Sequence, residues 1–384
     1  MISSIKKYFI RKTYDVIFYY PQHFNRNENG ENPYFEKLIS SCVKNNFSYL
    51  LLEEPDRGTK YPRSKKATKF DFWFYLIIIF KKIIPSSLFK NYLAKELSIA
   101  KVISLLSLNR FKANTYITIS NAKINFLSGL NSRANVFDLQ HGVIYSWHPG
   151  YFNRDFSLHQ LLRPKKINFL VSGTSFKHVF CINEDFCNYK TSDSVSVIGN
   201  VLSEDITYSK RKFSSILYTL QITDDLTTKE IDDEKIELVS FIKSIASFFI
   251  ENKLSLILKN HPRFNDDFFL NSLQGKFFFV EISKKNMNDV ASEIFLHLTK
   301  SSTSIFELAQ RGIPSLLVQN EVGSKIFIDE YKYPIKTSDI CKQTNEYLQN
   351  RIRYMEDQKR VIEWVSGFYE PYNEEAFIEI LTQT

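Results

Sequence analysis

The segment NVFDLQHGVIYSWHPGY, Asn135 to Tyr151, gathers chemically active side chains at the end of an apolar run. It holds two of the chain's 7 histidines, His141 and His148, and two of its 11 glycines. An imidazole can serve as a general base or bind ligand oxygens, and Gly142 lets the backbone turn sharply. The cluster therefore predicts a strand end that opens onto a ligand cleft. The alternative is a histidine that satisfies buried backbone groups beside a loop.

Basic side chains follow a later apolar run directly. The segment ILKNHPRF places Lys259, His261 and Arg263 immediately after a predicted strand. An imidazole and two cations at such a position could hold a phosphate. Taken alone, His261 could equally be a surface residue.

Hydroxyl side chains cluster in the segment LTKSSTSIFELAQRGIP, at a predicted strand-to-helix turn: Ser301, Ser302, Thr303 and Ser304. Hydroxyl groups and helix N-terminal N–H groups together form an anion site. Glu307 lies three residues after Ser304, so the two could also form a capping box. Because both clusters fall at carboxyl ends of strands in one half of the chain, a ligand site is favoured over separate caps and surface residues.

The elements that must position these residues alternate between strand and helix. In the first half, strands are predicted at 14–21, 47–54, 114–120, 135–140, 167–173 and 194–200, with helices at 33–44, 72–84 and 87–108. After the polar stretch 202–214 the pattern restarts, with strands at 215–221, 254–259, 294–299 and 314–319 and helices at 232–252 and 304–311. This alternation predicts an α/β protein with parallel sheets covered on both faces.

Two α/β units of similar size predict two Rossmann-like domains, residues 1–205 and residues 206–384 with C-terminal helices. The length of 384 residues also exceeds what one hydrophobic core usually supports. Ligands of such domains bind at the carboxyl ends of the strands, so we expect the two parallel sheets to face a central cleft.

Composition narrows the class of protein. A hydrophobic fraction of 43% is typical of a folded globular chain. The four cysteines form no CxxC pair, which argues against a zinc ribbon or a disulfide framework. The first 20 residues lack the apolar core and cleavage site of a signal peptide, so we expect a cytoplasmic location.

The net charge of +8 favours an anionic partner. The segment from Arg57 to Phe70 has six basic residues and no acidic one, and a run of nine apolar residues from Phe72 to Phe80 follows. Nine residues are far fewer than the roughly 20 that span a bilayer. The pattern is compatible with peripheral contact to the inner face of the cytoplasmic membrane, or with a solvated loop before a core helix. Nucleic acid is disfavoured, because no aromatic-interleaved basic stripe is present.

Together, KNHP and the later SSTSIFELAQRGIP resemble the donor-binding half of GT-B glycosyltransferases that build bacterial capsule and lipopolysaccharide. Within these, residues 215–320 are most similar to enzymes that use CMP-activated sialic acid or Kdo. The resemblance implies that His261 and the hydroxyls of Ser301, Ser302 and Thr303 contact the nucleotide and its phosphate. The segment LQITDDLT resembles a stretch of capsule β-Kdo transferases that contains a catalytic aspartate, which implicates Asp224 or Asp225.

QHG segments like that at Gln140–Gly142 also occur in bacterial surface-polysaccharide glycosyltransferases. They support an acceptor site at the end of this predicted strand, where Gln140 and His141 would face the cleft and His148 and Tyr151 could line it. A retaining reaction would use Asp224 or Asp225 as nucleophile. An inverting reaction would need only a general base, for which Asp138 and His141 are the candidates.

The implied activity is transfer of a sugar from a nucleotide-activated donor to a glycan or lipid-linked glycan acceptor. No D-x-D motif is present, so a metal-free reaction without a further cofactor is expected. Two other activities fit the same motifs. A nucleotide-sugar epimerase would act on the donor alone, and a CDP-polyol phosphotransferase would transfer a phosphodiester.

Overall fold

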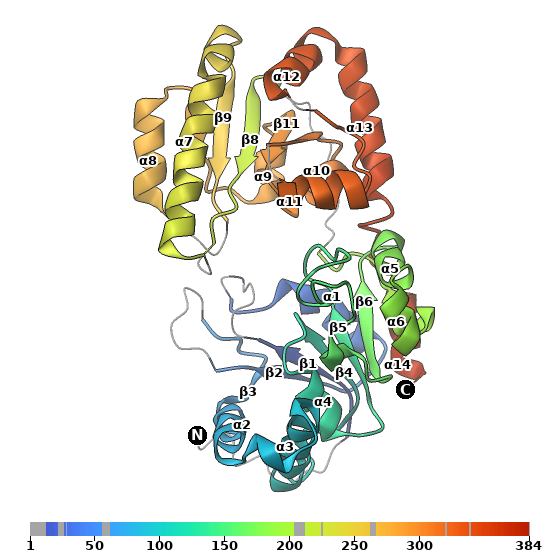
Figure 1. The fold of residues 1–384 in the computed structure, drawn as a ribbon. Helices are drawn as coiled ribbons and strands as arrows, with labels where there is room; N and C mark the ends of the chain where they lie inside the picture. Colours follow the sequence, from blue (N-terminus) through green and yellow to red (C-terminus); the bar gives the residue numbers. More distant parts are fainter. Residues whose placement is uncertain are drawn as a thin grey trace. The chain divides into compact units, whose positions relative to one another are not determined.

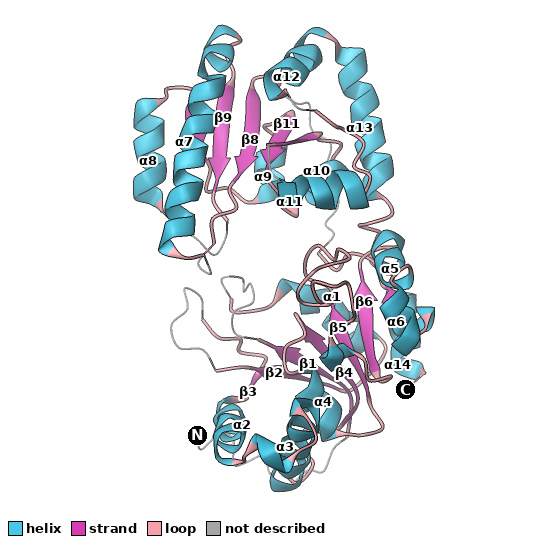
Figure 2. Ribbon diagram, viewed as in Figure 1, coloured by secondary structure: helices cyan, strands magenta, loops and turns pink. Residues whose placement is uncertain are grey.

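The computed structural model describes residues 13–21, 27, 29–55, 62–202, 212–223, 226–261, 266–318, 321–337 and 339–383. The chain divides into two compact units. Unit 1 comprises Met1–Ser203 and Tyr369–Thr384, and unit 2 comprises Glu204–Phe368. Each unit is an α/β structure built on one parallel sheet (Figures 1 and 2).

Unit 1 contains a seven-stranded sheet in the order β3-β2-β1-β4-β5-β6-β7. Its strands are β1 (Tyr14–Tyr20), β2 (Tyr49–Glu53), β3 (Thr68–Lys69), β4 (Ala113–Ile119), β5 (Asn135–Leu139), β6 (Ile167–Val171) and β7 (Val195–Val197). Its helices are α1 (Pro33–Lys44), α2 (Asp71–Ile83), α3 (Tyr92–Leu106), α4 (Ile124–Leu130), α5 (Thr174–Cys181), α6 (Glu184–Tyr189) and α14 (Glu374–Thr382). All neighbouring strands are parallel, as the alternating pattern predicts.

Successive side chains of β1 point to opposite faces of this sheet and so build two cores. Val16, Phe18 and Tyr20 belong to a buried cluster with residues of α1 and α14. Tyr19 packs on the other face, with its ring 6.0 Å from that of Phe70, which leads into α2. Helices α2, α3 and α4 lie together on this second face (Figure 1). Strand β1 is therefore buried on both sides, which explains its nearly continuous apolar sequence.

The C-terminal segment belongs to unit 1, whereas the sequence places residues 206–384 together in the second domain. Phe377 and Leu381 of α14 are buried in the cluster that contains β1 and α1. The returning chain also pairs with unit 1 at Asn200, whose N–H donates to the Glu370 carbonyl at 2.7 Å. Gly199 has a φ of +78°, and a Cβ there would lie 2.0 Å from the Pro371 carbonyl oxygen. Only glycine fits this crossing of the two segments.

Unit 2 contains a five-stranded sheet in the order β10-β9-β8-β11-β12. Its strands are β8 (Ser215–Thr219), β9 (Ser255–Lys259), β10 (Val280–Ile282), β11 (Leu296–Thr299) and β12 (Ser315–Leu317). Its helices are α7 (Thr228–Glu251), α8 (Asp267–Lys276), α9 (Met287–Ala291), α10 (Ser304–Gln310), α11 (Glu321–Gly323), the π-helix η5 (Ser324–Glu330), α12 (Ile340–Gln349) and α13 (Arg351–Val365).

Strand β8 supplies both faces of the unit 2 core. Leu217 packs in a cluster with residues of α9 and α10, while the Tyr218 ring faces α7 and lies 5.4 Å from the ring of Phe241. Helices thus cover both faces of this sheet as well (Figure 2). The polar residues that follow the strands lie at the carboxyl ends of the strands in each sheet.

Candidate functional site

The order of strands in unit 2 reverses between β8 and β11, because β9 and β10 lie on one side of β8 and β11 and β12 on the other. In open α/β sheets such a reversal marks the usual ligand site, outside the carboxyl ends of the strands. Register places Thr219 of β8 between Lys259 of β9 and Thr299 of β11. The clusters expected at 259–263 and 301–304 therefore begin at the same edge of the sheet.

Gln221 lies at this reversal and was not identified as a site residue from the sequence. The Ser301 hydroxyl is 3.5 Å from the Gln221 Oε1, and both residues are half-buried. The contact joins the segment after β8 to the segment after β11. The signal in the sequence was the polar residue that ends the apolar run SILYTLQ.

Lys259 and His261 follow β9 at the same edge. Lys259 is half-buried, its Nζ donates to the Lys285 carbonyl, and burial lowers its pKa while the nearby Glu307 carboxylate raises it. His261 is also half-buried. Because both side chains remain partly exposed, the cation and the imidazole are accessible to a phosphate.

The hydroxyl cluster forms a hydrogen-bonded turn between β11 and α10. The Ser302 N–H donates to the Thr299 hydroxyl at 3.0 Å, and the Ser304 N–H donates to the Ser302 hydroxyl at 3.2 Å. The N-cap of α10 is Thr303, whose side chain makes no capping bond. The capping box considered for Ser304 and Glu307 is therefore wrong. Among the described helices of unit 2, such a box occurs at the start of α7, between Thr227 and Glu230.

Ser304 faces the interior and not a ligand. It is 4% exposed, and its hydroxyl lies 3.3 Å from that of Thr219 and 3.4 Å from His297 Nε2. His297 is fully buried and also bonds Thr219 through Nε2 (2.9 Å) and Ser315 through Nδ1 (2.8 Å). Burial lowers the pKa of His297 to about 3, so its imidazole is neutral. This network ties the hydroxyl turn to β8 and β12, and Ser304 belongs to it as a positioning residue.

Lys300, between β11 and the hydroxyl turn, is anchored to α7. Its side chain is mostly buried, and its Nζ donates to Glu234 at 2.7 Å and to Glu237 at 2.5 Å. Burial lowers its pKa, but the two carboxylates outweigh burial and raise it above the usual value. On its other side the Lys300 carbonyl meets α11 at Gly323, where a Cβ would lie 1.9 Å from the oxygen.

In unit 1, the loop that follows β5 is held by Gln140. The Gln140 amide nitrogen donates to the Gly142 carbonyl at 2.7 Å, and its oxygen accepts from the Ser172 N–H at 2.9 Å and hydroxyl at 3.1 Å. Gln140 is 8% exposed. Both ends of its amide therefore bond to the protein. Gln140 thus positions the loop and the end of β6, whereas the sequence suggested a contact with the acceptor.

A buried carboxylate lies beneath this loop. Asp138 is 1% exposed, and it accepts from the Asn121 N–H at 2.6 Å and from the Tyr151 hydroxyl at 2.8 Å. Desolvation raises the pKa of Asp138 to about 7, against the two hydrogen bonds that lower it. Tyr151 is itself buried, so its hydroxyl serves Asp138 and does not line an open site.

His148 closes the loop above this pair. Its Nδ1 accepts from the Gly150 N–H at 3.0 Å, and its ring lies 5.0 Å from Tyr145 and 5.3 Å from Tyr151. Burial lowers the pKa of His148 to about 4, so the ring is neutral at physiological pH. His141, half-buried at the start of the loop, has its carbonyl bonded by the Tyr34 hydroxyl at 3.1 Å.

Asn121 connects the loop to the reversal of strand order in unit 1, which falls between β1 and β4. It follows β4 with a φ of +54°, and its Nδ2 donates to the Gly150 carbonyl at 2.7 Å. Its Oδ1 is buried and accepts no hydrogen bond from the described residues. Asn121 was not predicted as a site residue from the sequence, although a Ser-Asn pair after an apolar run is a recognisable turn signal.

Three predicted site residues, Asp224, Asp225 and Arg263, lie outside the described residues. Of the others, the structure brings Lys259, His261 and Ser301 to one strand edge and turns Ser304 inward. Gln140, His141, His148 and Tyr151 belong to unit 1.

No protein-family model matches the chain, and no curated protein matches it in sequence. Solved structures do resemble it. UDP-GlcNAc 2-epimerase from Neisseria meningitidis, solved with UDP-GlcNAc bound, is similar with a TM-score of 0.54 at 13% identity, over 96% of this chain and 100% of that one. TarM is similar with a TM-score of 0.53 at 11% identity, over 98% and 99% of the two chains.

The wall teichoic acid polymerase TagF is similar with a TM-score of 0.50 at 12% identity, over 96% of this chain and 88% of that one. At these identities the similarity concerns the fold. The chain has the two-domain Rossmann-like architecture that GT-B glycosyltransferases share with UDP-GlcNAc 2-epimerases.

Proposed function

We propose that this protein is a glycosyltransferase that takes a sugar from a nucleotide-activated donor. The observation that carries the proposal is the edge of unit 2 at the reversal between β8 and β11. There Gln221 and Ser301 are in contact, and Lys259 and His261 follow the adjacent strand β9. A fold of this type binds a nucleotide at such an edge, and these side chains offer the donors that a phosphate requires.

In this proposal His261, Lys259, Ser301 and Ser302 stabilise the departing nucleotide phosphate. Hydrogen-bond donors fixed before the reaction lower the barrier because they need no reorganisation as charge develops. The buried network of His297, Thr219 and Ser304 provides that fixation for the hydroxyl turn. Thr303, as the resemblance implies, and Arg263, from its place close after the strand at 254–259, complete the proposed donor set.

Unit 1 would bind the acceptor through the loop after β5. His141 is the proposed general base for an inverting reaction, since Asp138 is enclosed by Asn121 and Tyr151 and serves better to position the loop. A retaining reaction would instead use Asp224 or Asp225 as the nucleophile. The stereochemistry of the product decides between the two routes.

For the donor we propose a CMP-activated sugar, sialic acid or Kdo, and for the acceptor a capsule or lipopolysaccharide glycan, on the strength of the motif resemblance. The reaction is proposed to need no metal, so excess EDTA should leave turnover unchanged. CMP, CDP and UDP should each be titrated against the protein by calorimetry. Tightest binding of UDP or CDP would reject the CMP assignment while leaving transferase activity open.

The activity itself is tested by incubation with CMP-sialic acid, CMP-Kdo, UDP-GlcNAc and CDP-glycerol, with and without glycan acceptors. Sugar transfer that depends on acceptor is expected. Removal of the Ser301 hydroxyl (Ser301→Ala) should weaken nucleotide binding about tenfold, the cost of one hydrogen bond to a charged group. Ser244→Ala, on the exposed surface of α7, is the matched control and should bind normally. Wild-type protein that binds none of the nucleotides would contradict the proposal.

A nucleotide-sugar epimerase is the second candidate, because the similarity to the Neisseria epimerase covers that whole chain. An epimerase would convert a UDP-sugar without any acceptor. The same incubations separate the two activities, since an epimerised free donor and a glycosylated acceptor differ in mass and chromatographic behaviour. Transfer of a polyol phosphate from CDP-glycerol would identify the third activity.

A further inference from the structure

The positive charge of the chain is concentrated in one segment of unit 1, residues 62–112. This segment has eleven lysines and arginines against two acidic residues, a net charge of +9, while the whole chain carries +8. It contains α2, α3 and the strand β3 that precedes them. The rest of the molecule is therefore close to neutral, and any electrostatic attraction to an anionic partner is directed to this part of unit 1.

Helix α2 exposes an apolar stripe in the middle of this charge. Phe72, Ile79 and Ile83 are 59%, 47% and 70% exposed. At 100° per residue these three positions fall within 40° of one another around the helix. Trp73 and Ile77, which are buried, lie about 100° to 140° away from Phe72 and face the core. The helix thus has a second apolar face that the described residues leave uncovered.

Exposed apolar residues continue on the elements that follow α2. Leu88, in the short connection to α3, is 71% exposed, and Leu105 at the end of α3 is equally exposed. Isolated exposed leucines are common on soluble proteins, so these two add exposed apolar area to the segment but do not by themselves mark an interaction surface. Helices α2 and α3 lie side by side on one face of the sheet of unit 1 (Figure 1).

Several cations of the segment are already neutralised within the protein. Arg63 binds Glu53 and both carboxylate oxygens of Asp71, and Lys81 is paired with Glu96. Others are exposed and form no ion pair within the described residues: Lys65, Lys69, Lys82, Lys90 and Lys101. These five lysines are available to an external anion.

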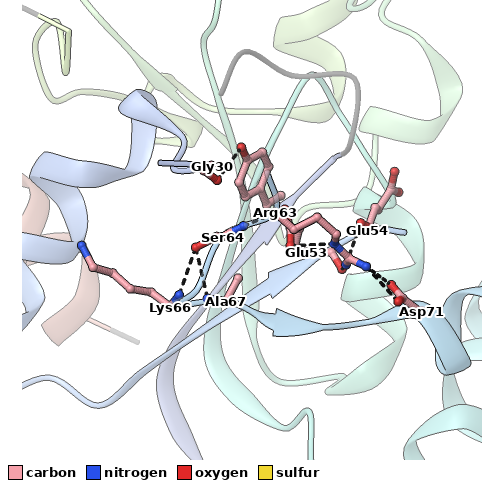
Figure 3. Close-up of polar contacts among 9 residues, drawn as sticks. Gly30, Glu53, Glu54, Arg63, Ser64, Lys66, Ala67 and Asp71 are labelled. Carbon is pink, nitrogen blue, oxygen red and sulfur yellow. Dashed lines mark hydrogen bonds and ion pairs between the residues drawn. The ribbon is translucent and has the colours of Figure 1, made fainter. Parts of the chain in front are cut away.

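The Arg63 contacts hold two of those lysines next to the apolar stripe. Its Nε donates to Glu53 at 2.9 Å, its Nη1 to both Asp71 oxygens at 2.8 Å, and its Nη2 to the Glu54 carbonyl at 3.0 Å (Figure 3). Asp71 is the first residue of α2. The segment from Arg63 to Asp71, which contains Lys65 and Lys69, is therefore fixed at both ends where it leads into the helix.

We propose that the exposed face of α2, with Lys65, Lys69 and Lys82 around it, docks on the surface of an anionic lipid bilayer. None of the described helices is long and apolar enough to cross a membrane. The 13 residues of α2 extend about 20 Å, less than a hydrocarbon core of about 30 Å. A short helix with one apolar face and basic neighbours lies in the plane of the interface, with its apolar side chains among the acyl chains.

Charge distinguishes this occupant from a second copy of the chain. Two identical faces, each within a segment of net charge +9, would repel one another. An anionic bilayer instead attracts the lysines through its phosphatidylglycerol headgroups and accepts the apolar side chains of the helix among its acyl chains. The inference concerns binding only and does not depend on the proposed sugar transfer. Its failure and the failure of the proposed function are therefore seen in different experiments.

The test is co-sedimentation of the full chain with vesicles of phosphatidylcholine alone or with 30% phosphatidylglycerol, in about 0.1 M salt. Wild-type protein should bind the anionic vesicles at least tenfold more tightly than the neutral ones. Lys65→Glu, Lys69→Glu and Lys82→Glu combined should weaken that binding about tenfold or more. Phe72→Ser, Ile79→Ser and Ile83→Ser combined should weaken it to a similar extent.

Matched triple variants in unit 2 control for net charge and for surface apolarity. Lys229→Glu, Lys243→Glu and Lys276→Glu change the charge equally at exposed positions, and Ile236→Ser, Phe268→Ser and Ile352→Ser remove exposed apolar groups elsewhere. Both should bind vesicles like the wild type. Loss of binding in the controls, absence of wild-type binding, or a wild-type dimer that only the α2 serine variant dissociates would overturn the proposal.

Discussion

At the scale of single residues, His261 offers a direct test of the proposed phosphate site. Replacing it by alanine (His261→Ala) removes one proposed donor to the departing phosphate. The variant should lose about 2 to 4 kcal/mol of transition-state stabilisation, which lowers kcat/KM roughly 30-fold to 1,000-fold. The fold should be unaffected, because His261 is only half-buried. Steady-state kinetics with the best donor measures the effect. His178→Ala, at an exposed position of α5, should retain full activity.

Asp138 and His148 give the loop after β5 two opposite dependences on pH. The pKa of His148 falls from 6.5 to about 4 on folding, so its protonation destabilises the protein as pH drops from 6.5 to 4. The pKa of Asp138 rises from 3.8 to about 7, so its ionisation destabilises the protein as pH rises from 3.8 to 7. Between pH 4 and 6.5 the two contributions oppose one another.

Asp138→Asn should therefore expose the histidine contribution. The asparagine side chain keeps an oxygen that can accept from the Asn121 N–H, but it has no carboxyl proton to release. Its free energy of unfolding should rise with pH between 4.5 and 6.5 more steeply than that of the wild type, by up to about 1.4 kcal/mol per pH unit. Urea unfolding at three pH values measures both slopes. Equal slopes would mean that Asp138 ionises normally in the folded protein.

The route of the proposed reaction can be tested at Asp224 and Asp225. If the product retains the donor configuration, mixing the enzyme with donor alone should give an adduct of one sugar, visible by intact-mass spectrometry. The adduct should be absent from one of the variants Asp224→Ala and Asp225→Ala, and that variant should still bind nucleotide. An inverted product, or turnover in both variants, would instead direct attention to His141.

The hydroxyl cluster at 301–304 was predictable from the sequence only in part. Its place at a carboxyl strand end could be predicted, because an apolar run ends there and a helical pattern begins. Which hydroxyls turn into the interior could not be predicted, because Ser301 and Ser304 have the same chemistry. The choice depends on the buried partners His297, Thr219 and Ser315, which come from other strands.

At the scale of elements, the hydroxyl turn depends on the close approach of α11 to the end of β11. Gly323→Ala would place a Cβ 1.9 Å from the Lys300 carbonyl oxygen. We expect a loss of about 1 to 3 kcal/mol of stability from overpacking and weaker nucleotide binding, because Lys300 leads directly into Ser301. Thermal unfolding and calorimetry measure the two effects.

Gly275, near the end of α8, provides the control for that substitution. A Cβ at Gly275 would have no atom within 4 Å. Gly275→Ala should therefore leave nucleotide binding unchanged and stabilise the protein by up to about 1 kcal/mol, because alanine favours the helix. If both alanine variants behave alike, the close approach at Gly323 does not constrain the turn.

The strands were largely predictable, because each long one is an apolar run bounded by polar residues. Strands β3 and β10 were not predicted, because each is short and includes a charged residue, unlike the short strands β7 and β12. The helix expected at 87–108 begins later, at Tyr92, where the Asn91 side chain caps it by accepting from the Ala94 N–H at 2.9 Å. An asparagine cap inside an apolar stretch is a local signal that the periodicity concealed.

At the scale of the whole molecule, the sequence did not predict which unit the C-terminal helix α14 packs against. The apolar positions of α14 show that one of its faces is buried, but not against which unit. The structure buries Phe377 against β1 and α1. Contacts between residues so far apart in the chain have no periodic signature.

Loss of that contact should destabilise unit 1 selectively. Phe377→Ala removes a fully buried ring and should cost about 3 to 5 kcal/mol in unit 1. Hydrogen exchange read by mass spectrometry should show faster exchange in β1 and α1, with β8 and β9 unchanged. Glu379→Ala, exposed on the same helix, should leave both units unaffected. Equal acceleration in the two units would mean that they unfold as one.

The return of the chain to unit 1 also determines how the molecule would bear mechanical load. Unit 2 lies, in chain order, between the two segments of unit 1. If tension is applied between β1 and α14, the load passes first through the packing of α14 on unit 1, and unit 2 is shielded from it. Only after α14 detaches does the pulling force reach unit 2 through Phe368. Single-molecule stretching should therefore record a small first extension, from detachment of the α14 segment, before either sheet unfolds.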